Sequence, residues 1–307
     1  MEVRVGGRYR LLEKINRGKG SEIWKAADVV NQKTFAVKLL KNRKKDAGVE
    51  REAKIYELLR NLEGFANVYW HGFEDKDIVL VLDLLGPSLE DLLFRLQKFS
   101  IPTVCGIAID VIEKLRILHS RNIIHRDLKP EDILLQSEGS QTLYLIDFDL
   151  SKSYKDSKNT HIPYIEGKPF IGNARYGSLN SHLGIENSRR DDLESLGYIL
   201  IYLLNGKLPW QGIKAYTSTE KYNKITEKKL SMIIEVLCEG LPTQFARFLQ
   251  YTRSLRFEER PQYEYLKNLF IGLRNTLQEP PFMYDWADPI GNESEISLEI
   301  SKKSDKN

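Results

Sequence analysis

The sequence has few cysteines, no long apolar run and almost no net charge. Cys105 and Cys238 are the only cysteines among 307 residues and lie far apart, which excludes a disulfide framework and a cysteine zinc site. There is no run of about 18 apolar residues, so no membrane span is expected. The start, "MEVRVGGRYR", lacks an apolar signal-peptide segment, which predicts an intracellular protein. A net charge of +3 argues against a general nucleic-acid binder.

The composition is that of a soluble globular protein, with 41% hydrophobic and 29% charged residues. A chain of this length can form one large domain or two lobes with an ample core. Its first part has the alternating, turn-punctuated pattern of strands, interrupted by one helical stretch. The predicted strands are 8–15, 22–30, 34–40, 68–73 and 77–85, and the predicted helix is 47–61.

From Ser88 onward the pattern becomes helical. Residues 101–120 place apolar side chains on one face, and residues 189–206 are apolar nearly all round in their second half, which predicts a buried helix. A small strand-rich lobe joined to a larger helical lobe predicts an α+β fold with a cleft near the connection. One domain is predicted at 9–286, made of an N-lobe at 9–83, a hinge at 83–87 and a C-lobe at 88–286. A polar, disordered tail is predicted at 287–307.

The loop "INRGKGSEIW", residues 15–24, lies between two predicted strands and contains two glycines. Read as G-x-G-x-x-G, its slots are Asn16, Gly18 and Ser21. By itself this match is weak, and it leaves three alternatives open: a drifted phosphate-binding loop, a loop that no longer binds phosphate, or an ordinary hairpin.

Two charged residues follow on neighbouring predicted elements. Lys38 lies on the strand "TFAVKLL" and Glu52 lies on the next helix. A buried lysine can hold nucleotide phosphates when a carboxylate orients it. Taken singly, a strand lysine is more often a solvated surface residue.

The segment "HRDLKPED", residues 125–132, fits the H-R-D-x-x-x-x-N pattern of a phosphoryl-transfer catalytic loop. Asp127 can accept the proton of an attacking hydroxyl, and Lys129 can steady the transferred phosphoryl group. Asp132 replaces the final Asn of the pattern. Because Asp also offers oxygen to a hard cation, metal binding at this position need not be lost.

"DFD", residues 147–149, follows a predicted strand that ends at Ile146 and fits the metal-binding D-F-G motif. Asp149 replaces the glycine, and Asp tolerates positive φ better than most residues do. A surface turn would explain "DFD" alone. The order Lys38, Glu52, Asp127 and Asp147 favours a catalytic site. Asp192, at the start of the buried helix, can act as its N-terminal carboxylate or reach back to backbone N–H groups of the catalytic loop, and we expect the second role.

At this point the sequence resembles a protein kinase, and more narrowly the casein kinase 1 family of Ser/Thr protein kinases. The family-specific stretches include "LLGPSLEDLL" (84–93), "HLGIENSRRDDLESLGYILIYLLNGKLPWQGIKA" (182–215) and "SLN" (178–180) in place of A-P-E. The match runs from about Tyr9 to Trp286. It implies a two-lobed, constitutively active enzyme that transfers the γ-phosphoryl group of ATP to Ser or Thr. Mg²⁺ is the implied metal, with Mn²⁺ as a second candidate.

The resemblance implies a role for each matching residue. Lys38, Glu52, Asp127 and Lys129 are the implied catalytic residues, and Asp132 and Asp147 are the implied metal ligands. Asp83 and Leu85 match the hinge, and Leu82 matches the gatekeeper position. The implied ATP-binding residues are Ile15, Gly18, Ile23, Ala36, Lys38, Leu82, Asp83, Leu85 and Leu135.

The family favours protein substrates that already carry a phosphate or an acidic residue before the target. Arg175 in "NARYGS" and Lys221 in "TSTEKYNKI" match the basic residues that bind this anion, and fixed cations can grip a phosphate through charge-assisted hydrogen bonds. Two solvated charges are the simpler alternative. A cytoplasmic location is expected, with the nucleus as a second address, although "TSTEKY" is less basic than the family's nuclear-targeting segment.

Several positions depart from the family pattern: Asn16, Gly20, Ser21, Asp132, Asp149 and Asn173, the last in place of a Thr. They motivate a second hypothesis, a pseudokinase that acts as an interaction module. A third, a small-molecule phosphotransferase, is weakened by Lys129. Because Asn tolerates positive φ and Gly20 supplies flexibility next to Ser21, we expect a working lid with altered ATP affinity.

Overall fold

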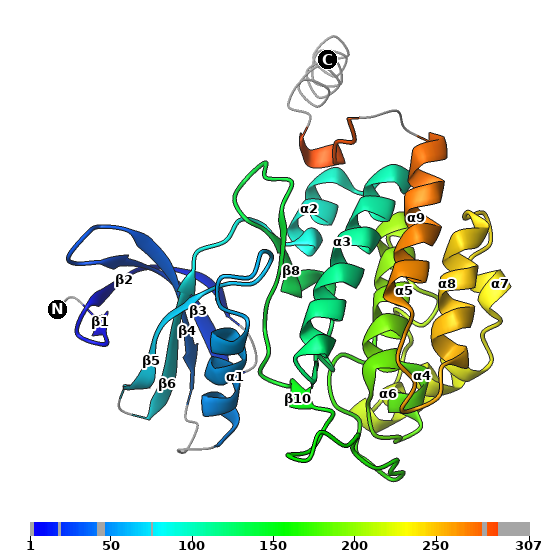
Figure 1. Ribbon diagram of the computed structural model, residues 1–307, viewed down its shortest axis with the longest axis horizontal. Helices are drawn as coiled ribbons and strands as arrows, with labels where there is room; N and C mark the ends of the chain where they lie inside the picture. The colour runs from blue at the N-terminus through cyan, green and yellow to red at the C-terminus, as the bar shows by residue number, and fades with distance from the viewer. Residues whose placement is uncertain (1–2, 18–19, 42–46, 75, 278–280, 288–307) are drawn as a thin grey trace.

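The computed structural model describes residues 3–17, 20–41, 47–74, 76–277 and 281–287. It has a strand-rich N-terminal region and a helical C-terminal region, which lie side by side in Figure 1. The predicted two-lobed α+β fold is therefore confirmed. No helix among the described residues is long and apolar enough to cross a membrane.

Within the described residues, one antiparallel sheet of six strands, in the order β1-β2-β3-β4-β6-β5, forms the N-terminal lobe. Val37, Val79 and Val81 lie in the small core on one face of this sheet. Helix α1 packs beside the sheet, and its buried Ile55 and Tyr56 belong to the larger core that continues into the helical lobe. The elements are β1 (Arg4–Val5), β2 (Tyr9–Arg17), β3 (Ser21–Asp28), β4 (Thr34–Leu40), α1 (Ala47–Leu58), β5 (Val68–Glu74) and β6 (Asp77–Asp83).

The helical lobe is built around helix α5 (Arg189–Asn205). Residues Leu193 to Leu203 of this helix are all buried, so its nearly all-round apolar sequence fits a central helix. Helix α3 (Ile101–Ser120) matches the predicted bounds, and α9 (Tyr263–Leu277) packs along it (Figure 1). The other helices are α2 (Leu89–Leu96), α4 (Leu179–His182), α6 (Ser218–Leu230), α7 (Ile234–Leu237) and α8 (Thr243–Ser254), with short 3-10 turns η1 (Pro130–Asp132) and η2 (Asp285–Ala287).

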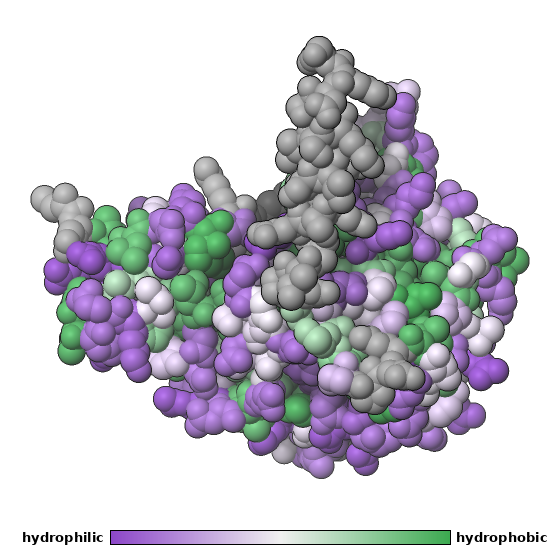
Figure 2. Space-filling view, turned by 90° about the horizontal axis from the view of Figure 1, so that it is seen from above, coloured by the Kyte–Doolittle hydropathy of each residue, from purple (hydrophilic) through white to green (hydrophobic). Residues whose placement is uncertain are grey.

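Short strands on the side of the helical lobe that is next to the N-terminal lobe hold the segments that face the sheet (Figure 1). Strand β8 (Ile133–Leu135) pairs with β9 (Leu143–Leu145), and β7 (Ile123–Ile124) pairs with β10 (Lys152–Ser153). These pairings bring the segment after β7 and the segment after β9 to the same edge of the lobe. On the face shown in Figure 2, hydrophilic and apolar side chains are interspersed over both lobes.

Candidate active site

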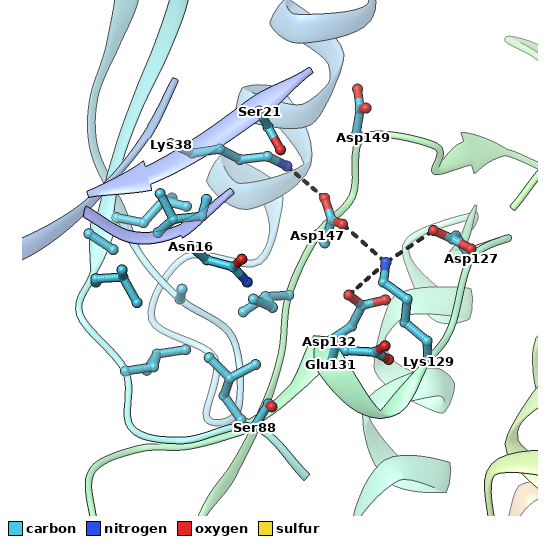
Figure 3. Close-up of a pocket in the computed structure, with 18 of the residues that line it drawn as sticks. Asn16, Ser21, Lys38, Ser88, Asp127, Lys129, Glu131, Asp132, Asp147 and Asp149 are labelled. Atoms are coloured by element: carbon cyan, nitrogen blue, oxygen red, sulfur yellow. Dashed lines mark hydrogen bonds and ion pairs between the residues drawn. The ribbon is translucent and has the colours of Figure 1, made fainter. Parts of the chain in front are cut away.

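A cavity of about 1040 Å³ lies between the sheet and the helical lobe. Its apolar lining comes from both lobes and includes Ile15, Ile23, Ala36, Leu82, Leu85, Leu134 and Ile146. Five charged side chains meet on one side of the cavity (Figure 3): Lys38, Asp127, Lys129, Asp132 and Asp147. A cavity that combines apolar walls with a cluster of charges suits a ligand with an aromatic base and an anionic tail.

Most of the residues expected to bind a nucleotide line this cavity: Ile15, Ile23, Ala36, Lys38, Leu82, Asp83 and Leu85. Gly18 lies outside the described residues. Leu135 needs a correction, because it is fully buried in the core, whereas its neighbour Leu134 lines the cavity. Successive side chains of a strand point to opposite faces, so an error of one residue in the match reverses the direction of the side chain.

Lys38 is held between two carboxylates. Its Nζ lies 2.8 Å from Glu52 Oε1 and 2.6 Å from Asp147 Oδ1, and the lysine is only 8% exposed. Burial disfavours the ammonium form, but the attraction of Glu52 and Asp147 outweighs it and raises the pKa of Lys38 well above its usual value. The contact with Glu52 spans the sheet and α1, and the contact with Asp147 spans the two lobes. Lys38 is therefore a fixed positive charge at the polar end of the cavity.

Tyr56 is a part of the site that sequence reasoning missed. It lies four residues after Glu52 on α1, and its hydroxyl accepts a hydrogen bond from the backbone N–H of Asp147 at 3.1 Å. Its ring packs edge-on against Phe148, with centroids 4.9 Å apart. One face of α1 thus holds Lys38 through Glu52 and the 147–148 turn through Tyr56. The apolar spacing of α1 predicts only that Tyr56 is buried.

On the helical side, Lys129 joins three carboxylates (Figure 3). Its Nζ lies 2.9 Å from Asp132 Oδ1, 3.1 Å from Asp127 Oδ2 and 3.4 Å from Asp147 Oδ2. Burial opposes the charge on Lys129, but these carboxylates prevail and raise its pKa. Burial raises the pKa of Asp132 well above its usual value, helped by the nearby negative charge of Asp147. The single positive charge of Lys129 therefore neutralises the negative charges of the three carboxylates only in part.

Two oxygen atoms of this cluster are left without a hydrogen bond. Within the part of the chain that the structure describes, Asp127 Oδ1 and Asp132 Oδ2 are buried and have no hydrogen-bond partner. Such atoms carry a desolvation cost, so they point to a ligand or to chemistry. Asp127 Oδ1 can accept a proton, and Asp132 Oδ2 can bind a cation.

Asp132 and Asp147 fit a hard divalent cation in their chemistry. Both offer carboxylate oxygens to the same end of the cavity, and Asp132 Oδ2 lacks a partner among the described residues. The described residues contain no group of three or more metal-binding side chains, so the protein alone does not enclose an ion. Two carboxylates suit Mg²⁺, which usually keeps waters and takes further oxygens from bound phosphates.

Asp192 fixes the backbone of the catalytic loop, as expected from the sequence. It accepts hydrogen bonds from the N–H groups of His125 at 2.7 Å and Arg126 at 2.8 Å. Because a charged carboxylate can only accept, His119 Nε2, 2.8 Å away, donates to it as well. Burial alone would raise the pKa of Asp192, but these bonds lower it, so the carboxylate stays charged. Arg126 has a φ of 71°, a left-handed angle that costs energy and that these bonds help to maintain.

The unusual residues of the sequence do not lie in strained backbone. Positive φ occurs at Gly20 (87°) and Asp147 (68°), whereas Asn16, Ser21 and Asp149 are not among the residues with positive φ. The ability of Asn16 and Asp149 to tolerate glycine-like backbone angles is therefore not needed in this structure. Figure 3 places Asn16 and Ser21 on the sheet side of the cavity and shows Asp149 pointing away from Lys129.

A glycine that the motif reading did not use is required next to Asp127. Gly172 has a φ of 97°, and a Cβ at this position would lie 2.6 Å from Arg126 O and 2.9 Å from Asp127 Oδ1. Any side chain here would push against the catalytic loop. Its neighbour Asn173 lines the cavity and accepts a hydrogen bond from the N–H of Arg175 at 2.9 Å.

The two expected anion-binding residues lie on different segments. Arg175 is half-buried, donates to Tyr176 Oη at 3.2 Å and packs over the rings of Tyr176 and Tyr202. Lys221 is exposed on the first turns of α6. No contact between these two side chains is present among the described residues, so an anion between them would have to bridge them.

Comparison with known families agrees with this geometry. A family model of the protein kinase domain matches residues 9–273, which is most of the chain. The chain therefore belongs to the protein kinase domain family. Use of ATP and a divalent metal ion is general in this family.

Proposed function

We propose that this protein kinase transfers the γ-phosphoryl group of ATP to Ser or Thr residues of acidic or already phosphorylated proteins, as members of the casein kinase 1 family do. The observation that carries the proposal is the line of contacts from Glu52 through Lys38, Asp147 and Lys129 to Asp127. It joins the sheet to the catalytic loop across one cavity. Phosphoryl transfer depends mostly on positioning and on stabilising charge, and this line supplies both.

In the proposed mechanism, the base of the nucleotide occupies the apolar end of the cavity, between Ala36 and Leu134. Lys38, held by Glu52, binds the phosphate oxygens next to the γ-phosphoryl group. Asp132 and Asp147 would hold Mg²⁺, which neutralises phosphate charge when bound.

Asp127 receives the proton of the attacking Ser or Thr hydroxyl as the new O–P bond forms and the bond between the γ-phosphorus and the β–γ bridging oxygen breaks. ADP leaves with the electron pair of that bond. Lys129, 3.1 Å from Asp127, stabilises the charge that develops on the transferred group. The unpartnered Oδ1 of Asp127 is the atom proposed to accept the proton.

The alternative function is a pseudokinase that binds partners without turnover. It is motivated by Asn16, Ser21, Asp132 and Asp149. Since Asn16, Ser21 and Asp149 lie outside positive-φ conformations, these changes do not require a distorted site, which favours the active enzyme. The two functions predict different results in one assay, transfer of labelled phosphate from ATP to an acidic peptide. Turnover supports the enzyme, whereas binding of Mg·ATP without turnover in any peptide would favour the pseudokinase.

The proposed substrate class rests on Arg175 and Lys221. Lys221→Glu reverses a charge at the proposed anion site, so we expect it to lower kcat/KM for a peptide that carries a phosphate before the target by about tenfold or more, the size of one charge-assisted hydrogen bond. An unphosphorylated peptide of the same sequence should lose far less. Lys228→Glu, an exposed reversal on the same helix, serves as the control. Equal losses on both peptides would refute the assignment.

A further inference from the structure

The backbone that carries Arg175 is held from beneath by buried side chains. His182 Nε2 lies 3.1 Å from Ala174 O, Trp210 Nε1 donates to Arg175 O at 2.7 Å, and Lys229 Nζ donates to Gly177 O at 2.5 Å. These carbonyl groups only accept, so each of the three side chains is a donor. Residues 174–177 therefore rest on a row of donors that come from α4, the turn after α5, and α6.

Lys229 is the least expected member of this row. It is fully buried, and its Nζ lies 4.8 Å from the centroid of the Tyr198 ring and 4.9 Å from that of Trp210. Burial lowers the pKa of Lys229 to about 7, although Glu194 raises it. A lysine is almost never fully buried unless it is paired, because its charge is costly to desolvate. Its bond to Gly177 and the two aromatic rings are the compensating contacts here.

Glu194, Arg253 and Tyr198 complete the support. Glu194 Oε1 accepts hydrogen bonds from Leu179 N at 3.1 Å, Tyr198 Oη at 2.6 Å and Arg253 Nε at 3.2 Å. We call Glu194, Tyr198, Trp210, Lys229 and Arg253 the anchor cluster. It binds the chain at Arg175, Gly177 and Leu179, which are alternate residues of one short segment.

Helix α6 connects the anchor cluster to the second proposed anion-binding residue. Lys221 and Lys229 are eight residues apart on this helix, Lys221 exposed and Lys229 buried. The bond from Lys229 to Gly177 is therefore a direct link between the helix that carries Lys221 and the segment that carries Arg175. Trp210, against which Lys229 packs, holds the carbonyl of Arg175 itself. The Phe170 ring packs closely on the other side of Gly177, where an added Cβ would lie 2.7 Å from it.

We propose that Lys229 is a positioning residue that fixes the spacing between Arg175 and Lys221, and so sets the preference for substrates that carry a phosphate. This inference rests on the proposed function. Methionine keeps the unbranched shape of the lysine side chain against Tyr198 and Trp210 and removes the cost of burying an ammonium group, so Lys229→Met should fold. It would leave Gly177 O without its donor and allow the two segments to shift apart.

The test measures kcat and KM for a phosphorylated peptide and for its unphosphorylated counterpart in wild type, Lys229→Met and the exposed control Lys228→Met. We expect Lys229→Met to raise KM for the phosphorylated peptide by about tenfold, with kcat unchanged and the other peptide little affected. Trp210→Phe, which keeps the ring contact but removes the donor to Arg175 O, should act in the same direction.

The outcomes separate this inference from the proposed function. If wild type does not prefer the phosphorylated peptide, the proposed substrate class is wrong and this inference falls with it. If wild type shows the preference and both variants keep it, the substrate class stands and the role of Lys229 is wrong. Equal losses on both peptides, or a loss in kcat alone, would show that Lys229 is merely structural. If Lys229→Met does not fold, Trp210→Phe alone decides.

Discussion

Two buried groups of charges in this molecule contrast with each other. The cleft cluster, made of Lys38, Glu52, Asp127, Lys129, Asp132 and Asp147, borders the cavity and contains three buried carboxylate oxygens without a partner among the described residues. The anchor cluster lies under the segment 174–179, and none of its buried polar side-chain atoms lacks a partner in the same part of the chain.

The difference shows what each group is suited to do. Unpaired buried oxygens cost stability, and a fold retains them where a ligand or a reacting group completes them. Fully bonded buried charges bring no chemistry, but they hold the backbone in one arrangement. We therefore assign the reaction to the cleft cluster and the placing of the substrate to the anchor cluster. Removal of the negative charge of Glu194 in the anchor cluster should therefore lower stability, whereas removal of that of Asp132 in the cleft cluster should raise it.

The largest effect on stability is expected at Glu194. Glu194→Gln keeps the size of the side chain but removes the buried negative charge that faces Arg253, which leaves a half-buried cation uncompensated. Loss of one partner of a buried ion pair costs about 3 kcal/mol. Denaturant unfolding of this variant measures the loss, and Glu227→Gln, exposed on α6, is the control. Unchanged stability would contradict the assigned role of the anchor cluster.

Tyr56→Phe should lower activity while the aromatic packing is kept. The substitution retains the ring against Phe148 but removes the oxygen that accepts the N–H of Asp147. A buried N–H without a partner costs about 1–3 kcal/mol, so we expect kcat to fall by about tenfold. Amide hydrogen exchange should become faster at Asp147 alone. A general loss of stability would instead speed up exchange throughout the protein. Tyr265→Phe, remote on α9, controls for loss of a hydroxyl.

The smallest effect, and the one of opposite sign, is expected for Asp132→Asn. Burial raises the pKa of Asp132 in the folded protein, so the unfolded chain loses this proton at a lower pH than the folded protein does. Stability from this residue is present below the unfolded pKa and falls as pH rises through the window up to the folded pKa.

Asparagine cannot ionise, so it removes the cost of burying a negative charge at position 132. The free energy of unfolding of the variant should therefore rise by about 1 kcal/mol at neutral pH. The difference from wild type should shrink in acid. Thermal or denaturant unfolding at several pH values measures it. If Asp132→Asn were less stable than wild type at neutral pH, the charge of Asp132 would stabilise the fold as that of Glu194 does, which would contradict the proposed difference between the two clusters.

Much of the site could be predicted from the sequence, because its catalytic residues stand in short motifs at the ends of predictable elements. Lys38, Asp127 and Asp147 are found in this way. Tyr56 and Lys229 could not be found, because each acts through a contact with a residue 91 or 52 positions away in the sequence. Motifs record local order, and these contacts arise only from tertiary packing.

Two departures from the sequence motifs have an equally physical explanation. Asn16 and Asp149 stand where the motifs have glycine, but neither adopts a glycine's left-handed backbone angle. In the structure the left-handed angles fall at Gly20 and Asp147 instead. Leu134 and not Leu135 lines the cavity, because neighbouring side chains of a strand point to opposite faces.

The most direct test of the proposed reaction is a single-turnover comparison of wild type and Asp127→Asn with saturating Mg·ATP and a phosphorylated acceptor peptide. Since general-base catalysis contributes about 10²- to 10⁴-fold, the variant should transfer phosphate at least about a hundredfold more slowly, with the Kd for Mg·ATP unchanged. Equal rates in the two proteins, or no transfer by wild type despite intact Mg·ATP binding, would contradict the proposed role of the cleft cluster.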